Sequence, residues 1–194
     1  GTPFIFNQIL SEGYQVPRLF IVGERTEEKG NQILGPICPK SRGRAVFRVI
    51  ARGEKTHSGL AGVQFDLVGR LFRAKEAILE LAERDLTLSS SDGWQSQVRF
   101  PFAQVGIEGV YNITPDYGVL GVEIRLIPED NAENLRAKIE AYGEDLGLEV
   151  KFEGIEGGVA CDPNNEYLQR LKQAVKMVSG IEPILGKKLP GSSA

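Results

Sequence analysis

The sequence contains few of the residues that build metal sites and disulfide frameworks. Its 194 residues include one histidine, one tryptophan, one methionine and two cysteines. Cys38 and Cys161 lie far apart and show no Cys-x-x-Cys spacing, so neither a zinc knuckle nor a disulfide scaffold is predicted. A single histidine also excludes any metal site that takes two imidazole ligands from this chain.

Long apolar runs and blocks of one charge are also missing. No apolar segment approaches the about 20 residues that a membrane-spanning helix needs, and the N-terminus shows no secretory-leader pattern. Lysine and arginine are spread along the chain and the net charge is −3, which argues against nucleic acid as a partner. We therefore expect a soluble, cytoplasmic protein that binds neither membranes nor nucleic acid.

The composition and the apolar periodicity are those of a globular protein. With 41% hydrophobic and 25% charged residues, the chain is long enough for one good core. Alternating apolar residues predict strands, and apolar residues at helical spacing predict helices. The strands are expected at 44–52, 96–105, 117–127 and 148–155, and the helices at 62–84 and 128–147, the second introduced by Pro128.

The order strand, helix, strand, strand, helix, strand predicts a ferredoxin-like βαββαβ sandwich of the α+β class. In this fold a four-stranded antiparallel sheet carries both helices on one face. An exposed sheet edge or helix invites pairing with a second copy, so we expect a homodimer through this domain.

The two ends of the chain are expected to belong to another, layered domain. A helix at 3–13 and a buried strand, "VPRLFIVGE", at 16–24 precede the sandwich, and a helix at 162–180 follows it. Neither end has enough strands to complete a sheet alone. We therefore divide the chain into 1–42, 43–155 and 156–194.

Four segments together resemble a known hydrolase family. They are "LFIVGE", "SRGRAVFRVIARGEKTHSG", "VYNITPDYGVLGVEIRLIPEDN" and "LPGSSA", in this order. They are similar to the co-catalytic zinc peptidases and amidohydrolases, the family of acetylornithine deacetylase, succinyl-diaminopimelate desuccinylase, aminoacylase and carboxypeptidase G. In that family a ferredoxin-like lid or dimerisation domain interrupts an α/β catalytic domain. The resemblance implies a fragment centred on the lid, 43–155, with 1–42 and 156–194 as parts of the catalytic domain.

The resemblance implies a role for two residues in the catalytic chemistry. Glu24, at the end of "VGE", matches a glutamate that binds one of two metal ions, and a carboxylate is an ordinary zinc ligand. His57 matches a lid histidine that in dimeric members reaches the partner's active site and stabilises negative charge on the substrate carbonyl. From the residues alone, Glu24 could equally end a strand and cap the next segment, and His57 could be an exposed loop residue without a role.

Four further residues match positions that contact substrate in the family. Asn112 and Arg125 match a lid asparagine and arginine, and an arginine fork suits a free carboxylate. Gly191 and Ser192 resemble a small-residue loop that lines the substrate pocket. A charged strand residue such as Arg125 also commonly marks a solvated face.

The function implied is hydrolysis of an amide bond in N-acyl amino acids or small peptides, next to a free carboxylate. The resemblance implies two zinc ions in the intact protein, with cobalt or manganese as other choices. Because the family uses two histidine ligands, we expect this chain to bind no metal tightly and to be inactive alone. Two alternative hypotheses remain: the chain is a stand-alone ferredoxin-like module that binds an amino acid, or it is a purely structural dimerisation domain.

Overall fold

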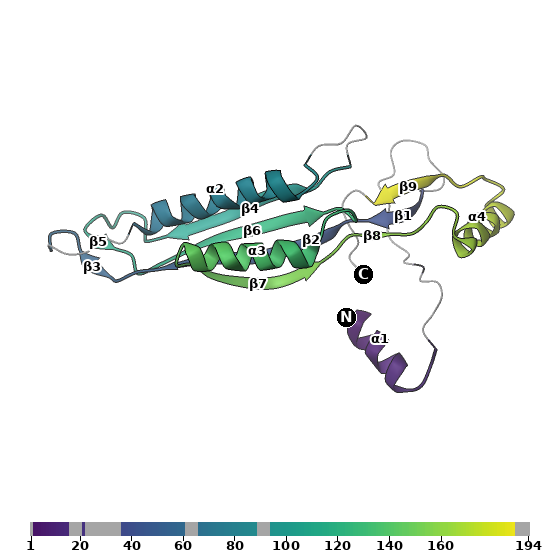
Figure 1. The fold of residues 1–194 in the computed structure, drawn as a ribbon, viewed down its shortest axis with the longest axis horizontal. Helices are drawn as coiled ribbons and strands as arrows, with labels where there is room; N and C mark the ends of the chain where they lie inside the picture. Colours follow the sequence, from purple (N-terminus) through teal and green to yellow (C-terminus); the bar gives the residue numbers. More distant parts are fainter. Residues whose placement is uncertain (1, 16–20, 22–35, 61–65, 89–93, 189–194) are drawn as a thin grey trace. The chain divides into compact units, whose positions relative to one another are not determined.

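The computed structural model describes residues 2–15, 21, 36–60, 66–88 and 94–188 (Figure 1). It divides into two compact units. The first comprises Gly1–Ser41 and Ala160–Ala194, and the second comprises Arg42–Val159. Among the described helices, none combines the length and the apolar character needed to cross a membrane.

The second unit is built on one antiparallel sheet of four strands, in the spatial order β4-β6-β2-β7. The predicted α+β class with a four-stranded antiparallel sheet is confirmed. Two helices lie on the same face of this sheet (Figure 1). In chain order the elements are β2 (Gly43–Arg52), α2 (Leu67–Asp85), β4 (Gln97–Val105), β6 (Tyr117–Leu126), α3 (Ala132–Asp145) and β7 (Glu149–Glu156).

The hydrophobic core lies between the sheet and the two helices. Every second residue of the central strands points into it, as the alternation in the sequence predicted. Phe47, one of these residues, is buried and packs its ring 5.0 Å from the ring of Phe152 on β7. The strand residues of the core include Ala45, Phe47, Val49 and Ala51 on β2 and Leu120, Val122, Ile124 and Leu126 on β6.

Polar side chains fix where the two helices begin. Asp66 caps α2 by accepting from the N–H of Gly69 at 2.8 Å. Asn131 caps α3 by accepting from the N–H of Asn134 at 2.9 Å. The prediction that Pro128 introduces this helix is therefore wrong, because residues 127–130 form a turn, closed by the Asp130 N–H on the Ile127 carbonyl at 3.0 Å.

At one end of the second unit, the buried carboxylate of Asp130 links two connections by hydrogen bonds. Asp130 is only 8% exposed, and it accepts hydrogen bonds from Thr87 N at 3.1 Å, from Ile127 N at 2.9 Å and from the hydroxyl of buried Ser96. We call this end, where β2 begins and β6 ends, the base. The Asp130 carboxylate joins the α2–β4 and β6–α3 connections there, so it closes the core at the base.

The opposite end consists of two loops that extend beyond the sheet. They pair through two short antiparallel strands, β3 (Thr56–His57) and β5 (Ile113–Thr114). We call residues 53–60 and 106–116 the tip. None of these residues is buried, and the structure describes all of them.

The first unit contains a three-stranded sheet in the order β8-β1-β9, with β1 and β9 parallel. Its last helix, α4, is capped by Asn165, which accepts from Leu168 N at 3.4 Å, and ends at Gly180 in a left-handed conformation with φ 73°. The predicted strand at 16–24 lies outside the described residues, apart from residue 21. The elements are α1 (Thr2–Ser11), β1 (Ile37–Ser41), β8 (Val159–Ala160), α4 (Glu166–Ser179) and β9 (Leu185–Lys188).

Candidate functional site

His57 lies at the tip, at the end of β3. Its carbonyl accepts from Leu60 N at 2.9 Å, which closes a tight turn, and its backbone pairs with Ile113 on β5. The turn folds the chain back so that the N–H of Gly59 donates to Nδ1 of the ring at 3.1 Å. The imidazole is thus exposed to solvent but held in one place by its own turn.

Asn112 lies beside His57, although 55 residues separate them in the sequence. The Asn112 side-chain amide is 3.4 Å from Nε2 of the ring, and the Asn112 carbonyl accepts from Ser58 N at 2.9 Å. The structure therefore brings together two of the residues predicted for the site. An imidazole and an amide at this separation can both offer N–H groups to one oxygen atom.

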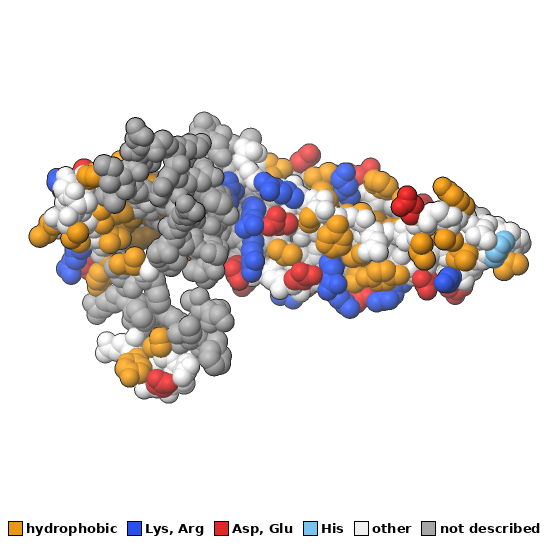
Figure 2. All heavy atoms as spheres, turned by 180° about the vertical axis from the view of Figure 1, so that it is seen from behind, with side chains coloured by type: hydrophobic (Ala, Val, Ile, Leu, Met, Phe, Trp, Pro, Cys, Tyr) orange, Lys and Arg blue, Asp and Glu red, His pale blue; other side chains and the backbone are white. Residues whose placement is uncertain are grey.

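Exposed apolar side chains surround this pair. Leu60, Ile107 and Tyr111 are 69%, 75% and 94% exposed. Figure 2 shows hydrophobic side chains gathered around the histidine at the narrow end of the second unit. Exposed apolar patches of this kind mark contact surfaces. Sequence reasoning missed these residues, because they follow no helix or strand period; the one signal was the apolar pair of Val110 and Tyr111 directly before Asn112.

Arg125 lies at the other end of β6, near the base. Its guanidinium is 2.6 Å from the carboxylate of Glu123, and its strand position pairs with Arg44 on β2. Since each strand residue advances the chain by about 3.3 Å, Arg125 is roughly 25 Å along β6 from the tip. The structure therefore does not bring Arg125 together with His57 and Asn112 within one copy of the chain.

A second arginine lies near Arg125 at the base. Arg42 places its guanidinium 4.6 Å from the ring centre of Trp94 and donates to the carbonyl of Gln95. Burial lowers the pKa of Arg42, and the positive charge of Arg125 lowers it further, while Asp130 opposes both. The base is therefore a region of positive charge that is partly compensated by buried and half-buried carboxylates.

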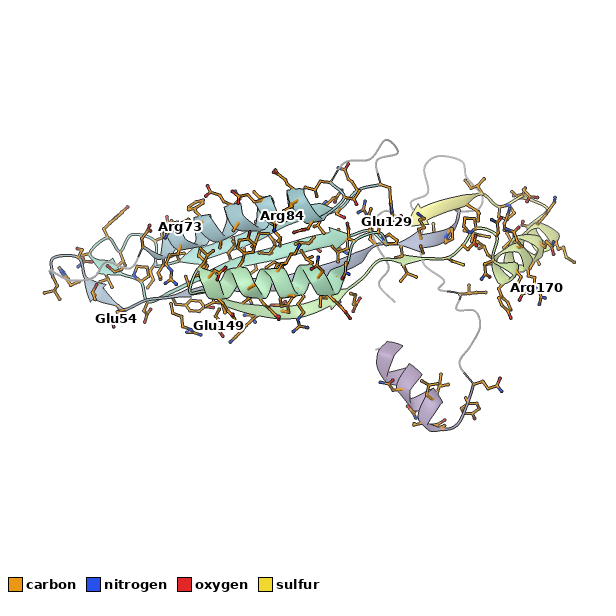
Figure 3. The ribbon with its side chains drawn as sticks, in the orientation of Figure 1. Glu54, Arg73, Arg84, Glu129, Glu149 and Arg170 are labelled. Atoms are coloured by element: carbon orange, nitrogen blue, oxygen red, sulfur yellow. The ribbon has the colours of Figure 1, made fainter. Side chains whose placement is uncertain are left out.

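Ion pairs between charged side chains lie on the surface of the second unit. Close to the tip, Arg52 lies 3.0 Å from Glu149, which also accepts from Lys151 at 2.8 Å. Hydrogen bonds from these two partners lower the pKa of the Glu149 carboxyl, and the bond from Lys151 has the larger effect. Figure 3 places Glu149 at the start of β7 and Glu54 beyond it, toward the tip. Such exposed pairs stabilise a fold weakly and give no sign of catalytic chemistry.

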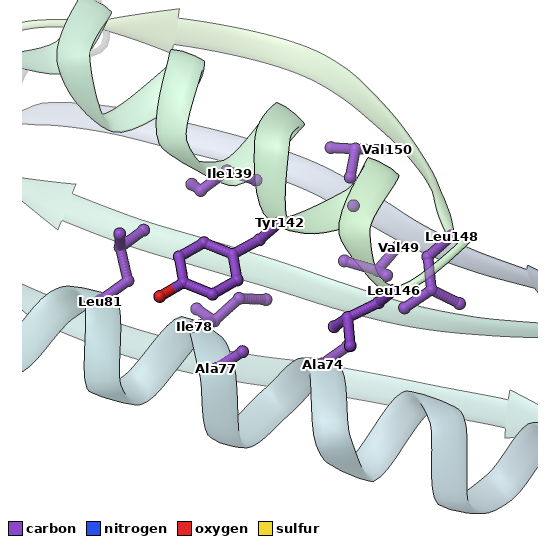
Figure 4. A pocket seen from close by; sticks show the side chains of 11 residues that line it. Val49, Ala74, Ala77, Ile78, Leu81, Ile139, Tyr142, Leu146, Leu148 and Val150 are labelled. Atoms are coloured by element: carbon purple, nitrogen blue, oxygen red, sulfur yellow. The ribbon is translucent and has the colours of Figure 1, made fainter.

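A small apolar pocket lies between α2, α3 and the sheet (Figure 4). Three small residues contribute to its lining, Ala74 and Ala77 on α2 and Gly143 on α3. Its other lining residues are apolar apart from Tyr142, and it contains no carboxylate, imidazole or thiol. This pocket is a gap in the core packing and lacks the groups that an active site needs.

The described residues do not form a metal site. Within them, no group of three or more histidine, cysteine, aspartate and glutamate side chains could hold a metal ion. Both ring nitrogens of His57 already face hydrogen-bonding groups. Glu24, Gly191 and Ser192 lie outside the described residues, so their predicted roles stay predictions.

No protein-family model matches the chain. A curated relative does: the probable di- and tripeptidase DUG2 of Saccharomyces cerevisiae is 29% identical over 133 residues, which are 62% of this chain and 15% of the relative.

The chain is also similar to solved peptidase structures. The M20 family metallo-carboxypeptidase Sso-CP2 from Sulfolobus solfataricus matches with a TM-score of 0.61 and 14% identity, over 81% of this chain and 49% of that one. The di-peptidase Dug1p from Saccharomyces cerevisiae matches with a TM-score of 0.57 and 14% identity, over 81% of this chain and 45% of that one. The predicted resemblance to metallopeptidases is confirmed, and the chain spans about half the length of these structures or less.

Proposed function

We propose that this chain is the lid and dimerisation part of a metal-dependent hydrolase that cleaves amide bonds in small peptides or N-acyl amino acids. The observation that carries the proposal is the exposed pair of His57 and Asn112, 3.4 Å apart at the tip. The names of the relatives, a di- and tripeptidase and a metallo-carboxypeptidase, support the substrate class. In this proposal residues 43–155 act as a ferredoxin-like sandwich that carries the tip.

The two side chains at the tip act on the carbonyl oxygen of the scissile amide. As the amide is attacked, negative charge develops on this oxygen, and N–H groups placed beforehand stabilise that charge. His57 supplies one N–H group from its ring and Asn112 supplies another from its amide. The exposed apolar residues Leu60, Ile107 and Tyr111 contact the surface into which the tip inserts, and they exclude water from the reacting atoms.

The substrate carboxylate is bound by Arg125 of a different copy of the chain. Arg125 and the tip are roughly 25 Å apart on one sheet, whereas a dipeptide spans at most about 7 Å. One copy therefore cannot place both groups on one small substrate. A homodimer in which each tip reaches the other copy's site resolves this separation.

The dimer forms along α2 and β4. Val68, Phe72 and Leu79 form an exposed apolar stripe on α2, at helical spacings of four and seven residues. Among the described strands, β4 lies at an edge of the sheet and pairs with β6 alone. An apolar helix stripe beside an open strand edge suits pairing with its own copy.

Metal ions in hydrolases of this kind polarise the scissile carbonyl and activate a water molecule. The described residues do not fit such a site, so we place the ligands outside them, with Glu24 as the one candidate in this chain. Because the chain has a single histidine, it is inactive alone in this proposal. We place the protein in the cytoplasm, and two cysteines that form no disulfide with each other, Cys38 and Cys161, suit a reducing compartment.

The experiment uses the full-length zinc-loaded protein with a panel of dipeptides and N-acetyl amino acids. His57→Ala should lower kcat by about 100-fold or more, the effect of removing one donor to an oxyanion, and leave the zinc content unchanged. Lys55→Ala, an exposed change two residues away, is the control and should leave kcat unaltered. An unchanged kcat in His57→Ala would overturn the proposal.

The exposed stripe on α2 also favours a second candidate, a dimerisation module without catalysis. This candidate predicts a dimer that hydrolyses none of the substrates and whose association does not depend on His57. Phe72→Ser would then abolish the dimer, with no activity to lose.

A further inference from the structure

Each ring nitrogen of His57 faces a hydrogen-bonding group. The Gly59 backbone N–H lies on the Nδ1 side at 3.1 Å, and the Asn112 amide lies on the Nε2 side at 3.4 Å. The ring can approach the Gly59 peptide this closely because glycine has no side chain. A Cβ on residue 59 would lie 3.2 Å from Nδ1 and 3.5 Å from Cε1, so it would crowd the ring.

The Gly59 peptide determines which ring nitrogen carries the proton. A peptide N–H only donates, so Nδ1 must present its lone pair to it. In the neutral imidazole the proton then sits on Nε2. In the opposite tautomer the hydrogen on Nδ1 would point at the hydrogen of the Gly59 N–H, and the hydrogen bond between Gly59 and Nδ1 would be lost.

Asn112 completes the arrangement on the other side of the ring. When Nε2 carries a proton, the NH2 group of Asn112 would face it as a second donor, so the amide oxygen turns toward the ring. A half turn of the amide exchanges its oxygen and its NH2 group at little cost. When a substrate oxygen arrives, the reverse turn makes Nε2–H and the Asn112 NH2 group available together.

We infer that Gly59 is a positioning residue whose backbone N–H selects the tautomer of the neutral His57 imidazole that carries its proton on Nε2, the nitrogen that faces Asn112. The purpose of this arrangement, donation to a substrate carbonyl oxygen, rests on the proposed function. The tautomer itself rests only on the geometry of the 57–60 turn. Gly59 thus acts through His57 and does not touch the substrate.

The test is nuclear magnetic resonance of the 194-residue chain labelled with ¹⁵N and carrying no histidine tag. Because the chain has one histidine, a long-range proton–nitrogen spectrum contains a single imidazole system. At alkaline pH the ratio of the Nε2–H to the Nδ1–H form should exceed that of the free peptide ARGEKTHSG by about fivefold. A scalar coupling across the hydrogen bond, between the Gly59 amide nitrogen and Nδ1, should also be observed.

Two variants distinguish the effect of the Gly59–His57 hydrogen bond on the tautomer ratio from the effect of the other surroundings of the ring. Gly59→Pro removes the N–H and should return the ratio to that of the peptide, whereas Ser58→Ala keeps the N–H and should leave the ratio high. If Gly59→Pro does not fold, the coupling in the unchanged chain decides. A ratio equal to that of the peptide together with no coupling overturns the inference.

The tautomer measurement tests the role of Gly59, and the activity assay tests the proposed function, so either can be contradicted without the other. If the tautomer ratio equals that of the peptide while His57→Ala still lowers kcat, the inference about Gly59 is wrong and the proposed function stands. If the ratio and the coupling are as expected while His57→Ala leaves kcat unchanged, the proposed function is wrong and the turn geometry stands.

Discussion

The two ends of the second unit use their polar groups in opposite ways. At the base, the Asp130 carboxylate is buried and directs its hydrogen bonds inward, to the α2–β4 and β6–α3 connections. At the tip, His57 and Asn112 are exposed and contact one another, with exposed apolar side chains around them. The polar groups at the base thus bind within the buried interior of the fold, whereas the polar pair and the apolar side chains at the tip are exposed to solvent.

This contrast separates residues that stabilise the fold from residues that perform a function. A buried polar group whose partners all lie within the fold contributes to folding stability. Substituting an exposed side chain in a loop whose backbone hydrogen bonds are kept changes the free energy of unfolding little. A change at Asp130 should therefore lower stability, and changes at His57 and Asn112 should alter mainly binding or catalysis.

The largest difference between the two ends should follow from removing one polar side chain at each. Asp130→Ala leaves two backbone N–H groups and the Ser96 hydroxyl without their acceptor, and should lower the free energy of unfolding by about 2 to 4 kcal/mol. Asn112→Ala should change it by less than about 0.5 kcal/mol. Urea unfolding followed by the fluorescence of Trp94, the sole tryptophan, measures both. Equal losses in the two variants would contradict the contrast.

A smaller effect should come from close backbone packing at the base. A Cβ on Gly158 would lie 2.5 Å from the backbone nitrogen of Pro128, and the backbone cannot move aside easily. Gly158→Ala should therefore lower the free energy of unfolding by about 1 to 3 kcal/mol. Gly154→Ala is the matched control, since a Cβ there meets no atom within 4 Å. If both variants unfold at the same urea concentration, the base is not tightly packed at this point.

The smallest effect concerns a part-buried ion pair on the surface near the base. The Lys138 ammonium, 2.6 Å from Asp85, lowers the pKa of this carboxyl. The stabilisation from the lowered pKa is present above the carboxyl pKa of the unfolded chain, about 4, and is lost as the pH falls through the folded value.

Urea midpoints at pH 7, 4 and 3 measure this loss. Asp85→Asn should lose less stability than the unchanged chain on acidification, and 1 M salt should reduce the difference. Glu149→Gln, which removes a pair near the tip, should show a similarly small effect, because ion pairs at the surface contribute little at either end. Parallel pH profiles for Asp85→Asn and the unchanged chain would show that the pair contributes nothing measurable.

The core of the second unit could be predicted from the sequence because its residues obey one period. Alternation along β2 and β6 indicated which side chains, such as Phe47 and Val122, face the helices. The start of α3 could not be predicted in this way. The helix begins after its cap, Asn131, because residues 127–130 form a turn. Asp130 in this turn accepts from Thr87 and Ser96, which lie far away in the sequence.

The candidate site could be predicted only in part. The proximity of His57 and Asn112 follows from the pairing of β3 with β5, two strands too short to show a period. The family resemblance named both residues but did not predict that they lie side by side. The resemblance also named Arg125, but the separation of Arg125 from the tip depends on the direction of β6 in the folded sheet. Ile107 and Tyr111 gave no periodic signal at all.

In the proposed homodimer, one active site takes His57 from one copy and Arg125 from the other. The most direct measurement uses two full-length variants, His57→Ala and Arg125→Ala, each assayed alone and then coexpressed so that mixed dimers form. Each variant alone should be inactive. The mixture should recover about a quarter of the unchanged activity, because half of the dimers are mixed and each mixed dimer has one complete site. If the mixture stays as inactive as the separate variants, His57 and Arg125 do not act across two copies, and the proposed shared site is wrong.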